Sequence, residues 1–261
     1  MKLSEKVVKV LNKKYGITNI DYAVVVGSGL KESVPKLEDE VDVSYEALGL
    51  PKSKVKGHSG SFTFGTYNGK NVALVSRMHY YESGDIAKVR LPLEIMAGLG
   101  VKTVVLLTSC GGLNVNFKVG DVMLIEDQIN MSGINPLIGM EEIKFVNMTN
   151  CYSLNLREMV KEISKKHKLG IKSGIFCQMS GPSYETNAEV QMLRGIGADA
   201  VSMSTAHDCI IAKYLDMNVV GFSVIVNVFS GEEQELSHQE VLDNASKACK
   251  KVNKILRLLI N

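Results

Sequence analysis

The chain has 261 residues, of which 45% are hydrophobic and 22% are charged, a composition that excludes a disordered protein. A chain of this length buries roughly three quarters of the surface that it exposes when unfolded, so it needs no disulfide or structural metal to hold its core. Its 30 basic and 28 acidic side chains give a formal net charge of +2, which is too small for a protein that mainly neutralises a nucleic-acid backbone.

Short aliphatic runs, each followed by small or polar residues, predict the strands. In chain order the runs are Tyr22–Val26, Val72–Val75, Thr103–Leu107, Ala200–Val201 and Val219–Val226. Near-continuous apolar runs are typical of strands that are buried on both faces. Because segments with helical spacing lie between them, we expect one α/β domain over residues 1–261. Its twisted, mixed and largely parallel sheet would carry helices on both faces.

Two helix starts have capping-box spacing. Thr186 stands three residues before Glu189, and Ser237 stands three residues before Glu240. The second start opens the last helix, which would therefore carry His238 in its first turn, near the end of the sheet.

A long loop is predicted at Asp127–Tyr152, which is rich in Asn, Met and Gly. Loops of this length in a compact domain are usually functional. At the start of the chain, Met1–Lys6 lacks the apolar stretch of a signal peptide and is expected to begin a helix.

The five cysteines are scattered, and none forms a CxxC motif or a Cys/His pair with metal-ligand spacing. We therefore expect a protein of the reducing cytoplasm with no metal site. The longest apolar run, Val219–Phe229, is interrupted by Gly221, Ser223 and Asn227, and it is far shorter than a membrane span. No membrane partner is expected.

Candidate anion-binding residues follow the first two predicted strands, at the sheet edge where open α/β sheets bind ligands. Gly27-Ser28-Gly29 would let the backbone approach an oxyanion, although the tripeptide alone is more often a plain turn. Arg77 directly follows a buried strand and must pair there. Its planar fork fits a phosphate, and an ion pair with a carboxylate is the alternative. His79 shares the same side of an extended chain as Arg77.

Two later segments carry groups that suit a flat heterocycle. Tyr184 and Glu185 lie in a tight turn, where the ring can stack on a base and the carboxylate can accept from a ring N–H. A helix-capping role for Glu185 is the alternative. Asn227 interrupts an apolar strand, where an amide is costly unless it is hydrogen-bonded. An amide donates and accepts at once, which suits a purine edge.

Taken in order, these features resemble the trimeric purine nucleoside phosphorylases, a family that also includes the methylthioadenosine phosphorylases. The resemblance runs from Val24 to about Leu242, which is nearly the whole chain. It rests on ten motifs in the family's order rather than on any single one. They are Gly27–Leu30, Gly57–Gly60, Arg77–Glu82, Gly111–Asn114, Val119–Ile125, Gly181–Thr186, Gly197–Val201, Met203–Thr205, Asn227 and His238–Leu242.

The resemblance implies a role for each matching residue. The phosphate group would be bound by Ser28, Arg77, His79, Ser204 and the backbone at Cys110, with His58 on a mobile loop above it. The ribose would be held by Tyr81, Met203 and His238, and the base by Tyr184, Glu185, Val201 and Asn227, with Gly112 in the same substrate-binding set. The catalytic residues implied are Asn227, Glu185 and His79.

The resemblance also implies an assembly. Members of the family are trimers in which an aromatic residue of the long loop closes the ribose pocket of the neighbouring subunit, and Phe145 is the matching residue here. No metal and no organic cofactor are implied, and the partners are a purine nucleoside and inorganic phosphate.

The implied reaction is a pentosyl transfer used in purine salvage. It is the reversible phosphorolysis of 6-oxopurine (deoxy)ribonucleosides, such as inosine and guanosine, to the free base and (deoxy)ribose 1-phosphate. Because the glycosidic bond breaks through an oxocarbenium-like state, phosphate beneath the ribose supplies both the nucleophile and a nearby negative charge. Asn227 would donate to N7 of the purine, and Glu185 would hold its N1–H.

Three positions depart from the family pattern. Ser109-Cys110-Gly111 stands where Asn-Ala-Ala is usual, and it would put an exposed thiol in the pocket. Val228 stands where mammalian relatives often have lysine. Ala206-His207-Asp208 replaces a sequence of the Val-Pro-Glu type, and we expect His207 to begin a helix rather than to catalyse.

Three alternative functions remain at this point. Methylthioadenosine phosphorylases have Asp at the position of Asn227 and no polar group at that of His238, so both residues favour a 6-oxopurine with a free 5′-hydroxyl. A catalytically silent nucleoside-binding protein and a hydrolytic nucleosidase have no need of a phosphate subsite. The presence of Ser28, Arg77 and His79 is therefore an argument against both.

Overall fold

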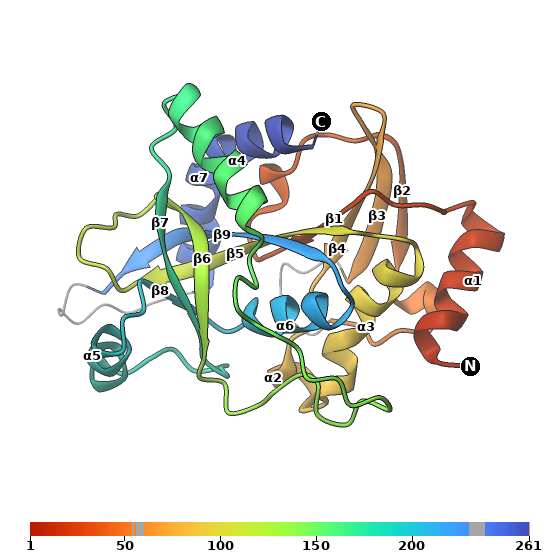
Figure 1. Ribbon diagram of the computed structural model, residues 1–261, viewed down its shortest axis with the longest axis horizontal. Helices are drawn as coiled ribbons and strands as arrows, with labels where there is room; N and C mark the ends of the chain where they lie inside the picture. Colours follow the sequence, from red (N-terminus) through yellow and green to blue (C-terminus); the bar gives the residue numbers. More distant parts are fainter. Residues whose placement is uncertain (54, 56–59, 230–237, 261) are drawn as a thin grey trace.

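The structure is a computed structural model that describes residues 1–53, 55, 60–229 and 238–260, with only the backbone described for 238–243, 246 and 247. Within these residues, nine strands form a mixed sheet in the order β2-β3-β4-β1-β5-β8-β7-β6-β9 (Figure 1). The strands are β1 (Tyr22–Val26), β2 (Glu38–Ser44), β3 (Ser61–Tyr67), β4 (Lys70–Ser76), β5 (Thr103–Gly112), β6 (Val122–Asn130), β7 (Lys172–Gln178), β8 (Ala200–Ser202) and β9 (Asn218–Val228).

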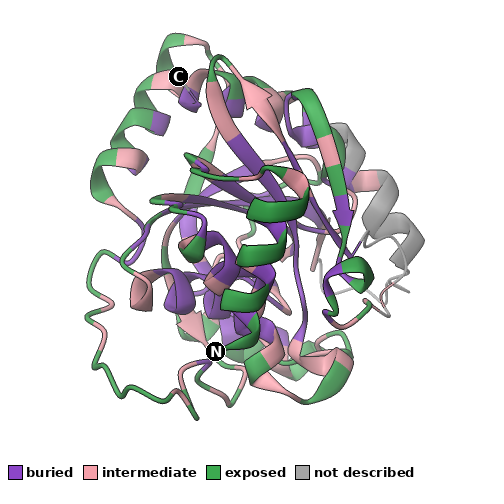
Figure 2. Ribbon diagram, turned by 90° about the vertical axis from the view of Figure 1, so that its right-hand side faces the viewer, coloured by how far each residue is buried: buried purple, intermediate pink, exposed green. Residues whose placement is uncertain are grey.

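Helices cover both faces of this sheet (Figure 1). They are α1 (Leu3–Tyr15), α2 (Tyr80–Ser83), α3 (Ile86–Gly98), α4 (Leu154–Lys166), α5 (Asn187–Gly195), α6 (Ala206–Tyr214) and α7 (His238–Leu259), with short 3₁₀ turns at Lys31–Ser33 and Glu46–Leu48. Apolar residues of α1, α3 and α6 join one buried cluster, and those of α4 and α7 join another on the opposite face. Figure 2 shows the central strands as largely buried, as predicted for strands that are covered on both sides.

All five predicted aliphatic runs are strands, and the mixed, largely parallel sheet is confirmed. Strand β1 pairs in parallel with β4 and β5, and β5 pairs in parallel with β9. The antiparallel pairs are β2 with β3, β3 with β4, β5 with β8, and β6 with β9. Because β1, β4, β5 and β9 run in the same direction, their carboxyl ends lie at one edge of the sheet.

The two ends of the sheet differ. Strand β9 pairs with β6 and also with β5, so that end turns back onto the middle of the sheet. At the other end, β2 pairs only with β3 among the described strands, and its register shifts between Glu38 and Val41.

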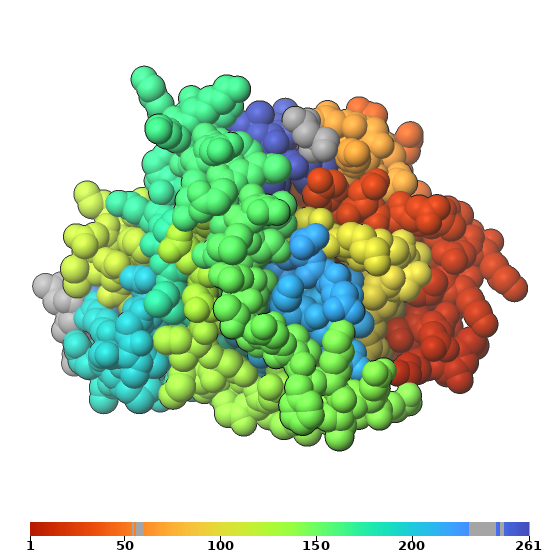
Figure 3. Space-filling view, viewed as in Figure 1, coloured from red at the N-terminus to blue at the C-terminus, as the bar shows by residue number. Residues whose placement is uncertain are grey.

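Two predicted boundaries are wrong. The predicted strand Thr103–Leu107 does not end at Leu107 but continues to Gly112, because Gly111 pairs with Val201 of β8 and with Asn227 of β9. Strand β6 extends to Asn130, because its last residues pair with β7, so the long loop begins after Asn130 rather than at Asp127. In Figure 3 this loop, residues 131–153, lies along the lower part of the face shown, next to α6.

The predicted helix starts are confirmed where they can be described. The Thr186 hydroxyl accepts from the backbone N–H of Glu189 at 3.2 Å, and the Glu189 carboxylate accepts from the N–H of Thr186 at 2.7 Å. Helix α7 begins at His238, whereas Ser237 lies outside the described residues. His207 is the second residue of α6, as expected for a helix start.

The five cysteines are free and buried. In the part of the chain that the structure describes, we find no helix that combines the length and the apolar character needed to cross a bilayer.

Candidate active site

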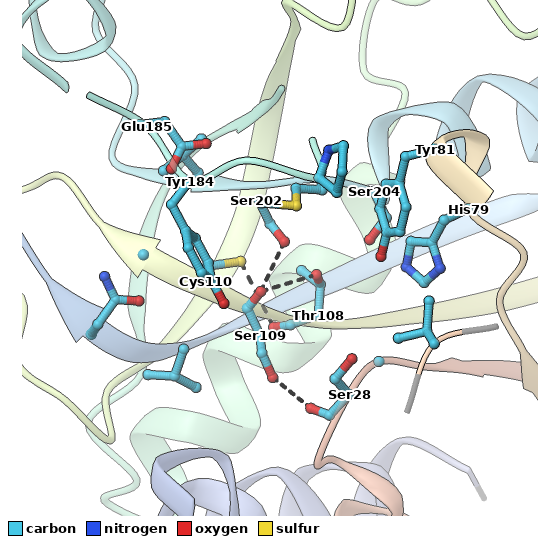
Figure 4. A pocket seen from close by; sticks show the side chains of 18 of the residues that line it. Ser28, His79, Tyr81, Thr108, Ser109, Cys110, Tyr184, Glu185, Ser202 and Ser204 are labelled. Carbon is cyan, nitrogen blue, oxygen red and sulfur yellow. Dashed lines mark hydrogen bonds between the residues drawn. The ribbon is translucent and has the colours of Figure 1, made fainter. Parts of the chain in front are cut away.

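A cavity of about 330 Å³ opens at the carboxyl ends of β1, β4, β5 and β9. Figure 4 shows Ser28 and His79 toward one end of it and Tyr184 and Glu185 toward the other, with Ser109 between them. The cavity brings together many of the residues that the sequence predicted for the site. These are Ser28, Arg77, His79, Tyr81, Cys110, Tyr184, Glu185, Val201, Met203, Ser204 and Asn227.

Two of the predicted residues that the structure describes, Gly112 and Phe145, do not line the cavity. Gly112 faces the other side of β5, since a Cβ built at this position would lie 3.0 Å from Ile225 and 3.1 Å from Val228. Phe145, in the long loop, is 97% exposed and does not line the cavity of its own chain. His58 and the side chain of His238 lie outside the described residues.

Arg77 is buried and makes the predicted ion pair. Its Nε donates to Oδ2 of Asp208 at 2.5 Å, and its Nη2 donates to Oγ1 of Thr205 at 3.2 Å. Both terminal nitrogens reach the carbonyl oxygen of Leu107 at 3.4 Å. These bonds to described residues use four of the five guanidinium N–H groups, which leaves one N–H of Nη1. The two alternatives left open by the sequence therefore coexist: Arg77 is paired with a carboxylate, and it also lines the cavity.

The contacts of Arg77 and Leu107 also explain why position 27 is a glycine. A Cβ at this position would lie 2.8 Å from the carbonyl oxygen of Leu107 and 3.5 Å from Nη1 of Arg77. The missing side chain thus lets β5 and Arg77 pass close to the turn after β1. This reason differs from the expected one, which was the approach of a bound oxyanion.

His79 is the N-cap residue of α2. Its Nδ1 lies 3.2 Å from Oε1 of Glu82, which also accepts from the backbone N–H of His79 at 3.0 Å. The imidazole stacks on the ring of Tyr81, with 4.8 Å between centroids and an interplanar angle of 24°. Burial lowers the pKa of His79 below its ordinary value, the hydrogen bond that His79 donates to Glu82 opposes this shift, and nearby Arg77 adds to it. The side chain is therefore oriented and favoured in its neutral form.

A chain of serine hydrogen bonds crosses the floor of the cavity (Figure 4). The Ser202 hydroxyl donates to the carbonyl oxygen of Ser109 at 2.9 Å, and the Ser109 hydroxyl donates to the carbonyl oxygen of Ser28 at 2.8 Å. Strand β8 and the turn after β1 are thus held by the same residue of β5.

The prediction that Cys110 would put an exposed thiol in the pocket is wrong. Cys110 lines the cavity but is 1% exposed, because β5 continues through it and neighbouring strands cover it. Burial raises the pKa of this thiol to about 12. Cys110 is therefore protonated at neutral pH and is a poor nucleophile.

At the other end of the cavity, Glu185 does not cap the following helix, because Thr186 and Glu189 form that capping box. The Glu185 side chain lines the cavity with Tyr184, and burial raises its pKa above the ordinary value. A partly buried carboxylate facing a cavity favours a ligand that donates a hydrogen bond to it.

Asn227 lines the cavity near the end of β9, opposite Gly111 of β5. Its Nδ2 lies 3.3 Å from where a Cβ on Gly111 would be. Val228, the next residue, lies toward Gly112 on the other side of the strand. The position that departs from mammalian relatives therefore does not line this cavity.

Sequence reasoning missed several lining residues, namely Val55, Thr108, Pro182, Ser202, Val226 and Phe229. The position of Phe229 in the site could have been predicted. It follows Asn227 by two positions, and an extended chain places such residues on the same side. Ser109 and Gly111 were noted as departures from a pattern, and strand alternation places them on one face once β5 is known to continue.

The described residues contain no cluster of three or more His, Cys, Asp or Glu side chains arranged to hold a metal ion. Among the residues that the structure describes, the polar groups that face the cavity are one guanidinium, one imidazole, several hydroxyls, one amide and one carboxylate. This set can bind an anion at one end and a hydrogen-bonding heterocycle at the other.

Comparisons with known proteins agree with this arrangement. Residues 21–261 match the phosphorylase superfamily. The chain is 37% identical over 244 residues to purine nucleoside phosphorylase 1 of Bacillus subtilis, covering 91% of this chain and 90% of that protein. It is 38% identical over 254 residues to the purine nucleoside phosphorylase of Bos taurus, covering 91% and 87%.

Solved structures show the same fold. The crystal structure of schistosoma purine nucleoside phosphorylase in complex with hypoxanthine superposes with a TM-score of 0.90 at 28% identity, covering 98% of this chain and 95% of that one. The sequence relationship, the shared fold and the cavity together identify this chain as an enzyme of the pentosyltransferase class that belongs to the purine nucleoside phosphorylase family of the phosphorylase superfamily.

Proposed function

We propose that this enzyme cleaves 6-oxopurine nucleosides with inorganic phosphate, giving the free purine and (deoxy)ribose 1-phosphate in purine salvage. The observation that carries the proposal is the layout of the cavity. Cationic and hydroxyl groups face one end, a carboxylate and an aromatic ring face the other, and an amide also lines it. A phosphate and a base would bind on either side of a ribose placed between them.

The phosphate end is supported by the geometry around Arg77. Asp208, Thr205 and the Leu107 carbonyl fix the guanidinium plane, and one N–H of Nη1 is left for an anion. Ser28, Ser204 and the neutral, oriented His79 add donors at the same end. An anion bound by a preorganised set of donors can act as the nucleophile at the sugar carbon without reorganisation of the site.

The base end is supported by Asn227 and Glu185. As the glycosidic bond breaks, negative charge builds on the departing purine, and a donor aimed at that charge lowers the barrier. The amide of Asn227 supplies this donor, and Glu185 accepts from N1–H of a 6-oxopurine. An amide at position 227, rather than a carboxylate, favours a 6-oxopurine over a 6-aminopurine.

The test is to incubate the enzyme with inosine, with and without phosphate, and to follow hypoxanthine. Release that depends on phosphate supports the phosphorylase. Release without phosphate would show a hydrolase, and tight binding of inosine without release would show a nucleoside-binding protein. Adenosine and methylthioadenosine are assayed in parallel, and cleavage of either at the rate of inosine would overturn the preference for 6-oxopurines.

We also propose a homotrimer in which Phe145 closes the ribose pocket of a neighbouring subunit. The support is its position: Phe145 is 97% exposed, and Ile143 near it is 82% exposed. Sedimentation would give the oligomeric state, and a monomer would remove Phe145 from the site. The five buried free thiols fit our further expectation of a reducing, cytoplasmic location.

A further inference from the structure

The ring of Phe229 lies against a position in β5 that has no side chain. A Cβ built on Gly111 would be 2.6 Å from Cε2 of Phe229 and 3.2 Å from its Cζ. Real Cβ atoms do not approach other atoms so closely, so any larger residue at position 111 would displace the ring. Both residues line the cavity, and the same Cβ would lie 3.3 Å from Nδ2 of Asn227. The ring and the amide therefore share one wall of the site.

Phe229 is held in this place by its backbone. Its N–H donates to the carbonyl oxygen of Gly112 at 3.2 Å. Its own carbonyl accepts from Nη2 of Arg194 at 2.5 Å, and Nε of the same arginine donates to the carbonyl of Leu113 at 2.7 Å. Arg194 thus links the ends of β5 and β9. Because both strand ends are fixed, the ring has little freedom to move away from a ligand.

The side chain of Phe229 is anchored as well. It packs against a buried apolar cluster formed by Leu113, Cys177, Val190, Leu193, Ala198 and Val201. Val201 lines the cavity too. A wall that is supported from behind by close-packed side chains resists the insertion of even one extra methyl group.

We propose that Phe229 is a specificity-determining residue, which limits the size of the purine base beside Asn227, and that Gly111 is the partner that gives its ring room. The inference rests on the proposed function and extends it. A phenyl ring offers no hydrogen bond to a base, so it selects by shape. In an apolar pocket, one methyl group is worth roughly 10- to 200-fold in relative kcat/KM.

The first test enlarges the wall. Phe229→Val is compared with the wild type on inosine and on two analogues that carry an added methyl group at C2 or C8 of the base, because both keep the N1–H that Glu185 would accept from. At least one analogue should gain about tenfold or more in kcat/KM relative to inosine. Val228→Ala is the matched control, because Val228 is the neighbouring residue and lies on the side of Gly112, and it should leave the relative rates unchanged. The absence of any gain in Phe229→Val, or an equal gain in Val228→Ala, would overturn the proposal.

The second test is a double-mutant cycle. Gly111→Ala should push the ring toward the base and lower kcat/KM for inosine by about tenfold or more, with the KM for phosphate changed by less than about threefold. Adding Phe229→Val should recover most of that loss, because the smaller side chain leaves room for the new methyl group. A folded Gly111→Ala enzyme with wild-type activity, or a double variant no better than Gly111→Ala, would contradict the pairing.

Equilibrium binding of hypoxanthine, measured by calorimetry, separates this inference from the proposed function. A wild type that binds hypoxanthine but does not release it from inosine would overturn the function. In that case the loss of affinity in Gly111→Ala, and its recovery in the double variant, still test the role of Phe229. A wild type that neither binds hypoxanthine nor releases it from inosine overturns both.

Discussion

The guanidinium of Arg77 and the carboxylate of Asp208 form an ion pair of 2.5 Å whose side chains are only 2% and 5% exposed. Asp208 belongs to α6 and Arg77 follows β4, so the pair joins a helix on one face of the sheet to the edge that carries the cavity. A charge pair in such a place orients the arginine for an incoming anion. It also makes the stability of the fold depend on both residues, because loss of either one leaves a buried charge unpaired.

Asp208→Asn should therefore lower the free energy of unfolding by about 3 to 5 kcal/mol, because it leaves a buried guanidinium without its counter-charge. Urea denaturation measures the loss. Asp216→Asn is the matched control, since its ion pair with Lys144 is 3.0 Å long but its side chain is 81% exposed. The control should change stability by less than about 1 kcal/mol. Equal effects of the two substitutions would show that burial does not govern the contribution of the Arg77 pair.

Ser109→Ala should weaken phosphate binding without weakening nucleoside binding. The Ser109 hydroxyl donates to the carbonyl oxygen of Ser28, and loss of one partly buried hydrogen bond costs about 0.5 to 1.5 kcal/mol, or roughly 2- to 13-fold in the KM for phosphate. Ser109→Thr keeps the hydroxyl and should restore binding. Ser202→Ala removes a bond to Ser109 but not the one to Ser28, so it should leave this KM near the wild-type value. An unchanged KM for phosphate in Ser109→Ala would refute this positioning role.

Asn227→Ala should reduce kcat by about 100-fold while the KM for inosine changes by less than about threefold, because a donor aimed at developing charge acts mainly in the transition state. Steady-state kinetics at saturating phosphate separates the two constants. If kcat and binding fall by equal factors, Asn227 binds the base but does not assist its departure.

His207 should make the fold sensitive to acid. Burial lowers the pKa of His207 below its ordinary value of 6.5, with Asp208 opposing the shift, and its Nε2 lies 2.8 Å from the Ser132 hydroxyl. As the pH falls below 6.5, the unfolded chain takes up the proton first, so the free energy of unfolding decreases. In His207→Gln this decrease should be shallower, by up to about 1.4 kcal/mol per pH unit. Parallel pH curves for the wild type and the variant would be inconsistent with a buried, neutral His207.

The sequence predicts the centre of this fold better than its edges, for a physical reason. Strands β1, β5 and β9 are buried on both faces, so their apolar runs are continuous and easily recognised. Strand β2 is acidic and mostly exposed, and its partner β3 mixes apolar and polar residues, so neither carries such a run.

Some residues of the site can likewise be predicted from the sequence, and others cannot. Residues with distinctive chemistry, such as Arg77, Glu185 and Asn227, were found because charge or an amide stands out beside an apolar strand. Ser109 and Phe229 were not assigned a role in the site, since their importance comes from neighbours that are distant in sequence: Ser28 and Gly111. Contacts of this kind depend on how strands are paired, and pairing is the part of the fold that local composition does not encode.

The edge strand β2 has a consequence for association between molecules. Since β9 turns back onto β5, β2 is the described strand that leaves one side unpaired, and an unpaired strand edge is a template for another chain. Four exposed carboxylates, Glu38, Asp39, Glu40 and Asp42, line this strand, and its register shift breaks the regular ladder. Two copies that met edge to edge would repel each other and find few matching hydrogen bonds. The charge on this strand thus protects the described edge of the sheet from pairing with the same edge of a second copy.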